Sequence, residues 1–586
     1  MYIETIPNRN SRPAVLLRQA WREGKRIRKK TMANLTDWPE DIVQGLRLLL
    51  KGEKLAPVKD IFEIERSVSH GHVKAVLETI KKIGLDTVIS STSCRQRDLV
   101  LGMIAGRLLF PCSKLATTRM WHTTTLADDL GINDADENEL YDAMDWLLER
   151  QGQIEKKLAN KHLGEGSTVF YDVTSSYYEG KTCPLARYGH NKDGKKGLPV
   201  IVYGMLTDKE GRPVAVDVYP GNTGDPSTVP DQASKLKEKF GLENIVLVGD
   251  RGMLTQTQIN KLKEYPGIGW ISALRSGSIK KLMSQGLVQM TIFDKTDLAE
   301  IQSPDFPGER LIACFNPLLA EERKRKREDL LISTEKLLSR LESQVSKRTK
   351  KPFDKAEIGK KAGSIINRYK MAKHFHLSIE DGRFSYSRKE DSIIKEASLD
   401  GIYVIRTCVS KDKLSPSDAV RTYKSLSGVE RVFRTMKGVD ILVRPIFHHI
   451  EDHVRSHIRF SRFLFRSSSR RRRDIFICTL AYYVEWHMRR ALAPLLFDDE
   501  DLDILRKTRH PVKPAKSSAS ATRKKTVKQT SDGLAVHSFK TLLAELSTLN
   551  RNKCRIKSSP DSPSFYQLTN PTPVQQKAFS LLGCSH

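Results

Sequence analysis

The chain has 586 residues, 39% of them hydrophobic and 7% aromatic, a globular composition that suits about three to five domains. Its formal net charge of +29 predicts a polyanionic partner such as nucleic acid, because lysines and arginines placed on phosphates release condensed counterions. The sequence has no apolar run of about 18 residues, no apolar signal core at its start and no CxxC pair among its eight cysteines, so we expect a cytoplasmic protein without a membrane partner.

The N-terminal region begins with short apolar runs split by prolines and surrounded by arginines and lysines. Residues 1–31 are therefore predicted to form a small basic β unit. Helical spacing of the apolar residues follows, and helices are expected at 38–51, 72–83, 95–110, 112–121 and 137–163. A basic β unit followed by helices suits a DNA-binding region, although the same charges could form only a solvated face.

A β-rich block follows, and it contains two aspartates on predicted strands. The run STVFYDVTS predicts a strand with Asp172 in its middle, and the almost fully apolar run NIVLVGDRGM predicts a strand that ends on Asp250. Other strands are expected at 199–206, 212–219 and 268–274, and helices at 229–240 and 255–264. Apolar strands of this kind are typical of a sheet covered on both faces, so the block indicates a mixed α/β domain.

The loop GHNKDGKKG lies between the Asp172 strand and the strand expected at 199–206. It nearly matches the phosphate-binding pattern GxxxxGK[ST], but Lys196 replaces the metal-binding hydroxyl and the loop leads into a strand. We therefore reject the nucleotide-binding interpretation. Lys192, Lys195 and Lys196 are instead candidate contacts to a nucleic-acid backbone.

Residues 276–400 interrupt the α/β pattern. A basic run at Arg323–Arg327 opens a helical stretch with leucines at roughly heptad spacing, and a second helix is expected near 354–372. Asp381–Gly382 predicts the turn of a β-hairpin, and the run at 403–407 predicts one more strand. We expect an inserted α+β domain built on a two-helix hairpin.

The run YKSLSGVERVFRTMK places Tyr423, Glu430 and Lys437 seven residues apart. On one continuous helix these three side chains would share nearly one face. Alternatively, Ser427 to Glu430 fits a capping box, and a helix that starts at Ser427 would break the alignment with Tyr423. Arg431 and Arg434 on the same stretch are candidate contacts to a DNA backbone.

The C-terminal third mixes helical and basic segments. His449, His453 and His457 lie on one helical face, but no acidic or cysteine ligands accompany them, so a zinc site is not favoured. A Ser/Arg-rich run at 459–474 breaks two helical patterns, and 506–533 is expected to be a mobile, DNA-attracting linker. Helical segments are expected at 475–495, 536–548 and 573–582.

The three acidic residues on rigid elements form the strongest chemical signal. If the first and fourth strands of the block are neighbours, Asp172 and Asp250 lie side by side, and a helix across the sheet adds Glu430. Three carboxylates do not stay ionised at close range without a counter-charge. Because oxygen-only ligands suit Mg²⁺ or Mn²⁺, we expect two such ions per active site.

The strand order, the VGDRGM run and the Tyr-x2-Leu-x3-Glu-x6-Lys spacing resemble the DDE transposases of bacterial insertion sequences. They are most similar to the branch whose ribonuclease H-like (RNase H-like) core carries a large insertion before the catalytic glutamate. The runs PGNTGDPST at 220–228 and LLAELSTLNR at 542–551 support the resemblance, which covers nearly the whole chain.

The resemblance implies that Asp172, Asp250 and Glu430 are the catalytic, metal-binding residues, and that Tyr423 and Lys437 grip the transposon end near the cut. It also implies double-stranded DNA as partner, both as transposon ends and as target. A homodimer on DNA and a place in the bacterial cytoplasm, associated with the nucleoid, are implied as well.

The sequence departs from the family pattern in three places. Leu426 stands where the family usually has an arginine, so one phosphate contact is missing or supplied elsewhere. No tryptophan occurs between 271 and 485, whereas relatives that cut through a DNA hairpin stack one on a flipped base, so Phe375 or Tyr386 would have to replace it. The run at 459–474 splits a normally continuous segment, which suggests a decayed copy whose C-terminal helix cannot pack.

We predict an α/β protein with an RNase H-like catalytic core, an inserted α+β domain, a basic N-terminal β/helical domain and a small C-terminal tail. The predicted boundaries are 1–165 for DNA binding, 166–275 and 401–498 for the core, 276–400 for the insertion, and 499–586 for the basic linker and docking element. The predicted activity is metal-dependent cleavage of 3′ ends at terminal inverted repeats, followed by strand transfer. The alternatives are a nuclease that cuts without joining and an inactive protein that binds DNA ends.

Overall fold

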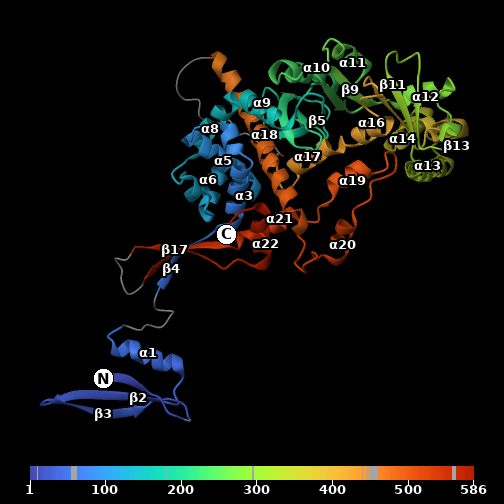
Figure 1. Ribbon diagram of the computed structural model, residues 1–586. Coiled ribbons are helices and arrows are strands. Elements are labelled where there is room, and N and C mark those ends of the chain that lie inside the picture. Colours follow the sequence, from blue (N-terminus) through green and yellow to red (C-terminus); the bar gives the residue numbers. More distant parts are fainter. Residues whose placement is uncertain are drawn as a thin grey trace. The chain divides into compact units, whose positions relative to one another are not determined.

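The computed structural model describes residues 1–9, 11–53, 62–180, 183–293, 296–438, 440–444, 446–447, 460–556 and 563–585, with the backbone alone at 446–447 and 460–473. The chain forms two compact units (Figure 1). The first unit combines Met1–Ser69 with Leu549–Asn570, and the second combines His70–Thr548 with Pro571–His586. The five domain boundaries expected from the sequence remain predictions.

The first unit confirms the basic β unit at the N-terminus. The antiparallel strands β1 (Tyr2–Ile6), β2 (Ala14–Glu23) and β3 (Arg26–Asn34) form a three-stranded sheet, followed by helix α1 (Glu40–Leu50). A second sheet pairs β4 (Phe62–Ser69) with β16 (Asn550–Ile556), which also pairs with β17 (Phe565–Leu568). Every residue of β3 is exposed, so its four basic residues face solvent.

The second unit begins with a run of helices. They are α3 (Gly71–Lys82), α4 (Leu85–Ile89), α5 (Arg95–Leu109), α6 (Lys114–Met120), η1 (Trp121–Thr123), α7 (Leu126–Leu130), α8 (Glu137–Glu149) and α9 (Gln151–His162). The periodicity of the sequence predicts α3, α5, α6, α8 and α9, but not α4, η1 and α7. The helix expected at 137–163 is two helices that meet at Arg150. Among the described residues no single helix is long and apolar enough to cross a membrane. Helix α5 and the segment Lys114–Thr123 reach that length and apolar composition only when taken together, and they are bent by 87° relative to each other.

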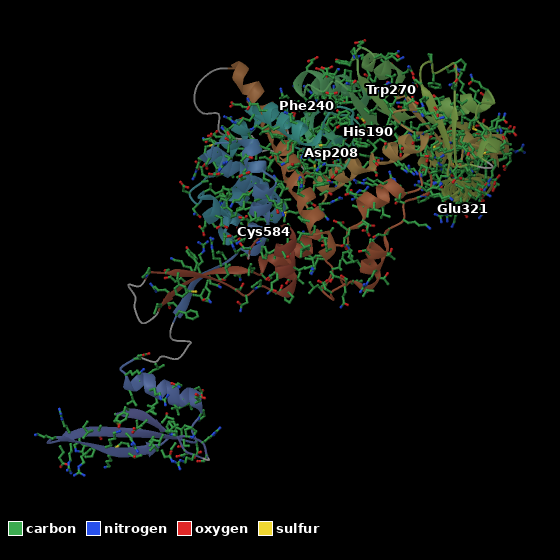
Figure 2. The ribbon with its side chains drawn as sticks, viewed as in Figure 1. His190, Asp208, Phe240, Trp270, Glu321 and Cys584 are labelled. Atoms are coloured by element: carbon green, nitrogen blue, oxygen red, sulfur yellow. The ribbon has the colours of Figure 1, made fainter. Side chains whose placement is uncertain are left out.

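A nine-stranded mixed sheet is the centre of the second unit, and it confirms the α/β class. Its strands run in the order β10-β11-β14-β9-β8-β5-β6-β7, and β15 also pairs with β5. The core strands are β5 (Ser167–Glu179), β6 (Val200–Thr207), β7 (Pro213–Pro220), β8 (Ile245–Gly249) and β9 (Ile268–Ala273). Helices η2 (Asp225–Thr228), α10 (Val229–Ser234) and η3 (Lys235–Lys239) connect β7 to β8, and α11 (Gln256–Leu262) connects β8 to β9. Trp270 of β9 is among the largest fully buried side chains (Figure 2).

The segment between β9 and the Glu430 helix extends this sheet and adds a core of its own. Its elements are α12 (Ser276–Ser284), η4 (Met290–Phe293), β10 (Leu298–Ile301), β11 (Arg310–Phe315), α13 (Pro317–Ser346), α14 (Lys355–Arg368), η5 (Ala372–His374), β12 (Phe375–Glu380), β13 (Arg383–Arg388), α15 (Glu390–Ala397) and β14 (Ile402–Thr407). The heptad leucines of α13 pack with α14 and the β12–β13 hairpin in a separate hydrophobic cluster. Strand β14 joins the main sheet antiparallel to β9, and β11 pairs antiparallel with β14 on its other side.

The remaining elements are α16 (Pro416–Lys424), α17 (Ser427–Lys437), β15 (Ile446–Phe447), α18 (Phe460–Ala491), η6 (Ala493–Leu495), α19 (Leu502–Thr508), α20 (Ala519–Val527), α21 (Phe539–Ser547) and α22 (Pro573–Leu582). Helix α18 continues through the Ser/Arg-rich run, and its residues 475–484 are half-buried or buried. The expectation that this helix cannot pack is therefore wrong from Ile475 onward. His449, His453 and His457 lie outside the described residues.

The mobile linker expected at 506–533 is an ordered segment of the structure. It contains the end of α19 and the whole of α20, and Val512, Ala521 and Lys524 are buried. Lys524 is buried because its ammonium donates to the carbonyl oxygens of Ala493 and Asp498, at 2.8 and 2.7 Å. Composition pointed to mobility here, but specific hydrogen bonds hold the basic side chains in place.

Candidate active site

Asp172 and Asp250 lie next to each other at two neighbouring strands of the central sheet. Strand β5 runs parallel to β8, the first and fourth strands of the block, with Tyr171 opposite Gly249. Each aspartate directly follows its member of this pair, so parallel pairing brings the two carboxylates together. The strand adjacency predicted from the sequence is confirmed.

The negative charges of Asp250 and Glu430 act on the carboxylate of Asp172. Burial is the largest cause that raises the pKa of Asp172 to about 6, and the negative charges of Asp250 and Glu430 act in the same direction. Lys192 and the N–H of Val173, which donates to Asp172 Oδ1 at 2.8 Å, oppose the shift. All three predicted acidic residues therefore interact electrostatically in one region.

Glu430 stands on the outer face of α17. The apolar stripe of this helix is buried, whereas Glu430, Arg431 and Arg434 are exposed. Helix α17 packs on β5 and β6, and the ring of Phe433 meets that of Tyr203 edge-on at 5.7 Å. The sequence pattern thus orients the helix so that its apolar stripe covers the sheet, while Glu430, Arg431 and Arg434 face outward.

The Tyr-Glu-Lys stretch is not one continuous helix, because α16 ends at Lys424 and α17 begins at Ser427. Helix α17 has Leu426 as its N-cap without a side-chain cap, so the capping box proposed for Ser427 and Glu430 is wrong. Ser427 instead donates its hydroxyl to the carbonyl oxygen of Lys424 at 3.0 Å.

Despite the break, Tyr423 reaches the site directly. Its hydroxyl donates to Asp250 Oδ1 at 3.2 Å. Burial and the adjacent Asp250 charge raise the pKa of Tyr423 above its usual value, so the phenol stays protonated and keeps donating. The tyrosine of the motif is therefore a hydrogen-bond partner of a candidate metal ligand.

Lys437 is buried and turned inward. Its ammonium donates to Thr174 Oγ1 at 2.8 Å, to Asp193 Oδ1 at 3.0 Å and to the carbonyl oxygen of Ser175. Asp193 also pairs with Arg444 at 2.7 Å, and its side chain is only 2% exposed. Burial lowers the pKa of Lys437 although Asp193 opposes this shift. The end of α17 is thus fastened to β5 and to the loop that follows it.

Asp193 is a residue that the sequence analysis missed. It lies in the Gly- and Lys-rich loop, where only the lysines drew attention. Of these, Lys192 pairs with Asp225 at 2.9 Å, Lys195 stands 5.9 Å from the ring centroid of Tyr177, and both Lys195 and Lys196 are exposed. The available signal was a single aspartate inside a basic loop, because a carboxylate among lysines is expected to form ion pairs.

The donor set fits a divalent cation by its chemistry. Asp172, Asp250 and Glu430 offer only carboxylate oxygens, which Mg²⁺ and Mn²⁺ prefer. Within the described parts of the chain, however, no three His, Cys, Asp or Glu side chains are grouped closely enough to hold a metal ion. The metal assignment therefore remains a prediction.

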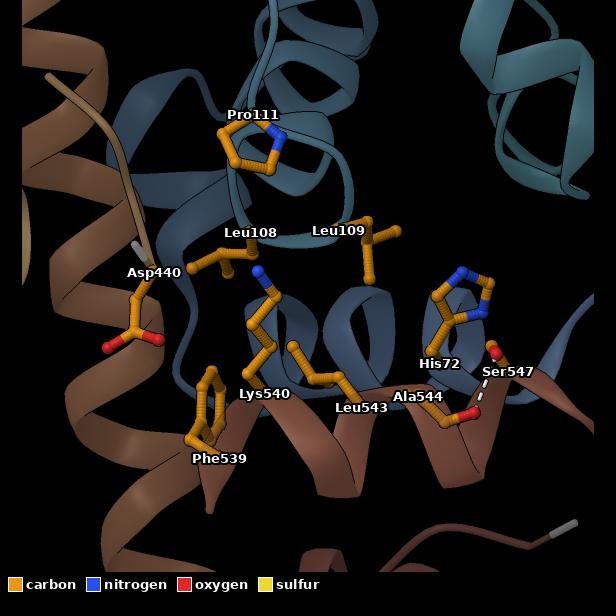
Figure 3. Close-up of a pocket in the computed structure, with 10 residues that line it drawn as sticks. All are labelled: His72, Leu108, Leu109, Pro111, Asp440, Phe539, Lys540, Leu543, Ala544 and Ser547. Carbon is orange, nitrogen blue, oxygen red and sulfur yellow. Dashed lines mark hydrogen bonds between the residues drawn. The ribbon is translucent and has the colours of Figure 1, made fainter. Parts of the chain in front are cut away.

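A cavity lies in another part of the second unit (Figure 3). It has a volume of about 240 Å³ and lies between α3, the end of α5 and α21, with Asp440 and Lys540 among its polar lining residues. Its His72 has a pKa lowered to about 4 by burial, so the imidazole is neutral near pH 7. None of the three predicted acidic residues lines this cavity, and we do not assign it to the reaction.

Comparison with known proteins gives one family match. Residues 164–444 match the family described as "Transposase DDE domain". Among solved structures, "Cryo-EM structure of piggyBac transposase synaptic complex with hairpin DNA (SNHP)" matches with 10% sequence identity and a TM-score of 0.31, over 79% of this chain and 88% of that chain. No curated protein matches the chain. The matched range includes Asp172, Asp250 and Glu430.

Proposed function

We propose, from the premise that this chain belongs to the DDE transposases through its residues 164–444, that it cuts the 3′ ends of a mobile DNA element and joins them to target DNA. Strands β7-β6-β5-β8-β9 would form its RNase H-like core, with residues 276–400 as the inserted domain. The carrying observation is the parallel pairing that puts Asp172 beside Asp250, together with the effect of Glu430 on Asp172.

The proposed chemistry consists of two phosphoryl transfers. In the first, a water oxygen forms a bond to phosphorus while the bond to the 3′ oxygen breaks, which leaves a 3′-hydroxyl on the element. In the second, this hydroxyl attacks a phosphodiester of the target, so one P–O bond replaces another. Mg²⁺ or Mn²⁺ held by Asp172, Asp250 and Glu430 would stabilise the charge on the attacking and leaving oxygens.

The chain's own residues would prepare the site in defined ways. Tyr423 fixes one oxygen of Asp250 through its hydrogen bond, so the carboxylate points in one direction before DNA arrives. Lys437 holds the end of α17, and with it Glu430, on β5. The exposed Arg431, Arg434, Lys195 and Lys196 are proposed contacts to DNA phosphates. A homodimer on paired DNA ends is also proposed.

The test uses labelled linear DNA that carries the sequences flanking the coding region of this chain, incubated with protein and Mg²⁺. Products of the wild type and of Glu430→Ala are resolved on a denaturing gel. We expect end cleavage and joined products from the wild type alone. Nicks without joining would favour the nuclease, and binding without cleavage in both proteins would favour the inactive DNA-end-binding protein.

A further inference from the structure

Three arginines from three different helices converge beside the helix that carries Glu430. Arg490 of α18 forms an ion pair with Asp503 of α19, which joins these two helices. Arg506 lies one turn after Asp503 on α19, so it occupies the same face. Arg431 of α17 lies one turn after Gly428, which packs beside the β6–β7 turn. Arg490 lies one turn after Trp486, which donates to the same turn.

The local backbone explains why these helices meet. The turn between β6 and β7 lies against the start of α17, where Gly211, at a φ of 87°, lies next to Gly428. The same turn accepts a hydrogen bond from Trp486 Nε1 of α18 to the carbonyl oxygen of Glu210 at 3.3 Å. Asp208, at the base of this turn, is buried (Figure 2). Helices α17 and α18 are therefore held against one common support.

The segment that contains α19 is fastened to α16 and does not hang free. Arg421 Nε donates to the carbonyl oxygen of Arg509 at 2.9 Å, and Arg509 Nη2 donates back to the carbonyl oxygen of Arg421 at 2.7 Å. Arg509 also donates to Ser425 Oγ at 3.2 Å, and Lys424 donates to the carbonyl oxygen of Val512. These reciprocal bonds at the α16–α17 junction fix where Arg506 is presented.

In the described parts of the chain, the three guanidinium groups have one carboxylate ion-pair partner between them. Arg490 has Asp503, but among the described residues neither Arg431 nor Arg506 forms an ion pair. The nearby Asp208 and Glu210 already pair with Arg212, at 2.6 and 3.4 Å. Burial, Arg431 and Arg490 lower the pKa of Arg506, and the charges of Glu210 and Asp208 oppose this shift. Such a cluster is stabilised when an anion binds to it.

We propose that Arg431, Arg490 and Arg506 together bind a backbone phosphate of the DNA substrate, an inference that rests on the proposed function. The guanidinium fork suits phosphate oxygens, and the position of Arg431 next to Glu430 places the bound strand near the reacting phosphodiester. Helix α19, in the segment that composition alone marks as a basic linker, thereby becomes part of the DNA-binding surface.

The experiment measures binding of a short labelled DNA duplex across a series of salt concentrations, without divalent metal and in a Glu430→Gln background so that no cutting occurs. Arg506→Gln is expected to weaken binding about tenfold and to lower the slope of log K against log salt by about one. Lys525→Gln, which removes an exposed charge from α20, is the matched control and should change affinity less than twofold. Equal affinity and slope for Arg506→Gln and its parent would overturn the proposal.

A second pair of variants tests whether DNA binding becomes tighter when a competing carboxylate is removed. Asp503→Asn frees Arg490 and should tighten DNA binding about threefold, because the competing carboxylate is gone. Asp532→Asn breaks a similarly exposed ion pair with Lys577 and changes the net charge equally, so it should leave binding nearly unchanged. Equal effects of the two variants would show that only overall charge matters and would refute a defined site.

The outcome is separable from that of the proposed function. Loss of affinity in Arg506→Gln, from a protein that never cuts DNA, would support the phosphate site and refute the transposase activity. If the wild type cuts and joins DNA while the Arg506→Gln variant binds DNA normally, the transposase activity would be supported and the phosphate site refuted. A wild type that binds no DNA duplex would overturn both.

Discussion

The network around Asp193 makes a quantitative prediction about how the Glu430 helix is held. Asp193 Oδ1 accepts from both Lys437 and Arg444, and its Oδ2 accepts from the N–H of Tyr177 at 3.2 Å. In Asp193→Asn the buried Lys437 loses its only ion-pair partner among the described residues. Breaking a buried pair in this way costs about 3–5 kcal/mol, and we expect about 3 because Arg444 is partly exposed.

The opposite substitution should cost less, because the network is asymmetric. In Lys437→Met, Asp193 keeps Arg444 as its partner, and the main loss is the hydrogen bonds to Thr174 and Ser175, about 1–2 kcal/mol. The double variant leaves neither charge behind, so it should be less destabilised than the sum of the two single variants by at least about 1 kcal/mol.

Hydrogen exchange of peptides from β5 and α17 is the appropriate assay, because a chain with more than one unit does not unfold in two states and local opening reports the affected region. Peptides from β3 serve as an internal control, since β3 belongs to the other unit. Equal costs for Asp193→Asn and Lys437→Met, or strictly additive costs in the double variant, would refute the reasoning.

Three further predictions concern chemistry and pH. Tyr423→Phe should slow single-turnover end cleavage about tenfold without changing the melting temperature by more than a few degrees, because it removes one hydrogen bond to Asp250. Burial lowers the pKa of His162 to about 4 and that of His487 to about 3, so both are neutral when folded. The unfolded chain takes up protons below pH ~6.5. Thermal stability should therefore be full above that pH and fall toward pH 4, and His487→Phe should flatten this fall in melts at several pH values. EDTA should abolish all DNA products, and added Mg²⁺ or Mn²⁺ should restore them on a denaturing gel; product formation in EDTA would contradict the metal assignment.

Much of the central sheet could be predicted because its signals are local. The apolar runs before Asp172 and Asp250 specify buried strands, and the stripe on α17 specifies which face of that helix covers the sheet. The heptad leucines of α13 likewise predict a helix that packs within its own cluster. In each case, burial of a repeating apolar face dominates the local structure.

The features that were not predicted depend on contacts between distant residues. Strand β16 has one buried residue, Cys554, and is stabilised by pairing with β4, which lies almost the whole chain away. Arg509 belongs to a segment whose composition is typical of a mobile linker, yet its backbone and side chain both bind Arg421. Composition reports the average solvation of a segment, whereas a few hydrogen bonds between specific atoms decide whether it is ordered.

The break between α16 and α17 shows how a motif can keep its chemistry after its simple geometry is lost. Seven-residue spacing on one helix would have put Tyr423, Glu430 and Lys437 on a common face, but Tyr423 belongs to α16, and Glu430 and Lys437 belong to α17. Tyr423 still contacts Asp250, which follows β8, and Lys437 still contacts Thr174 of β5, so the two ends of the motif bind to two neighbouring strands. Glu430 lies between these two anchors, and it follows that loosening either anchor should displace this carboxylate from the aspartates without altering its own helix.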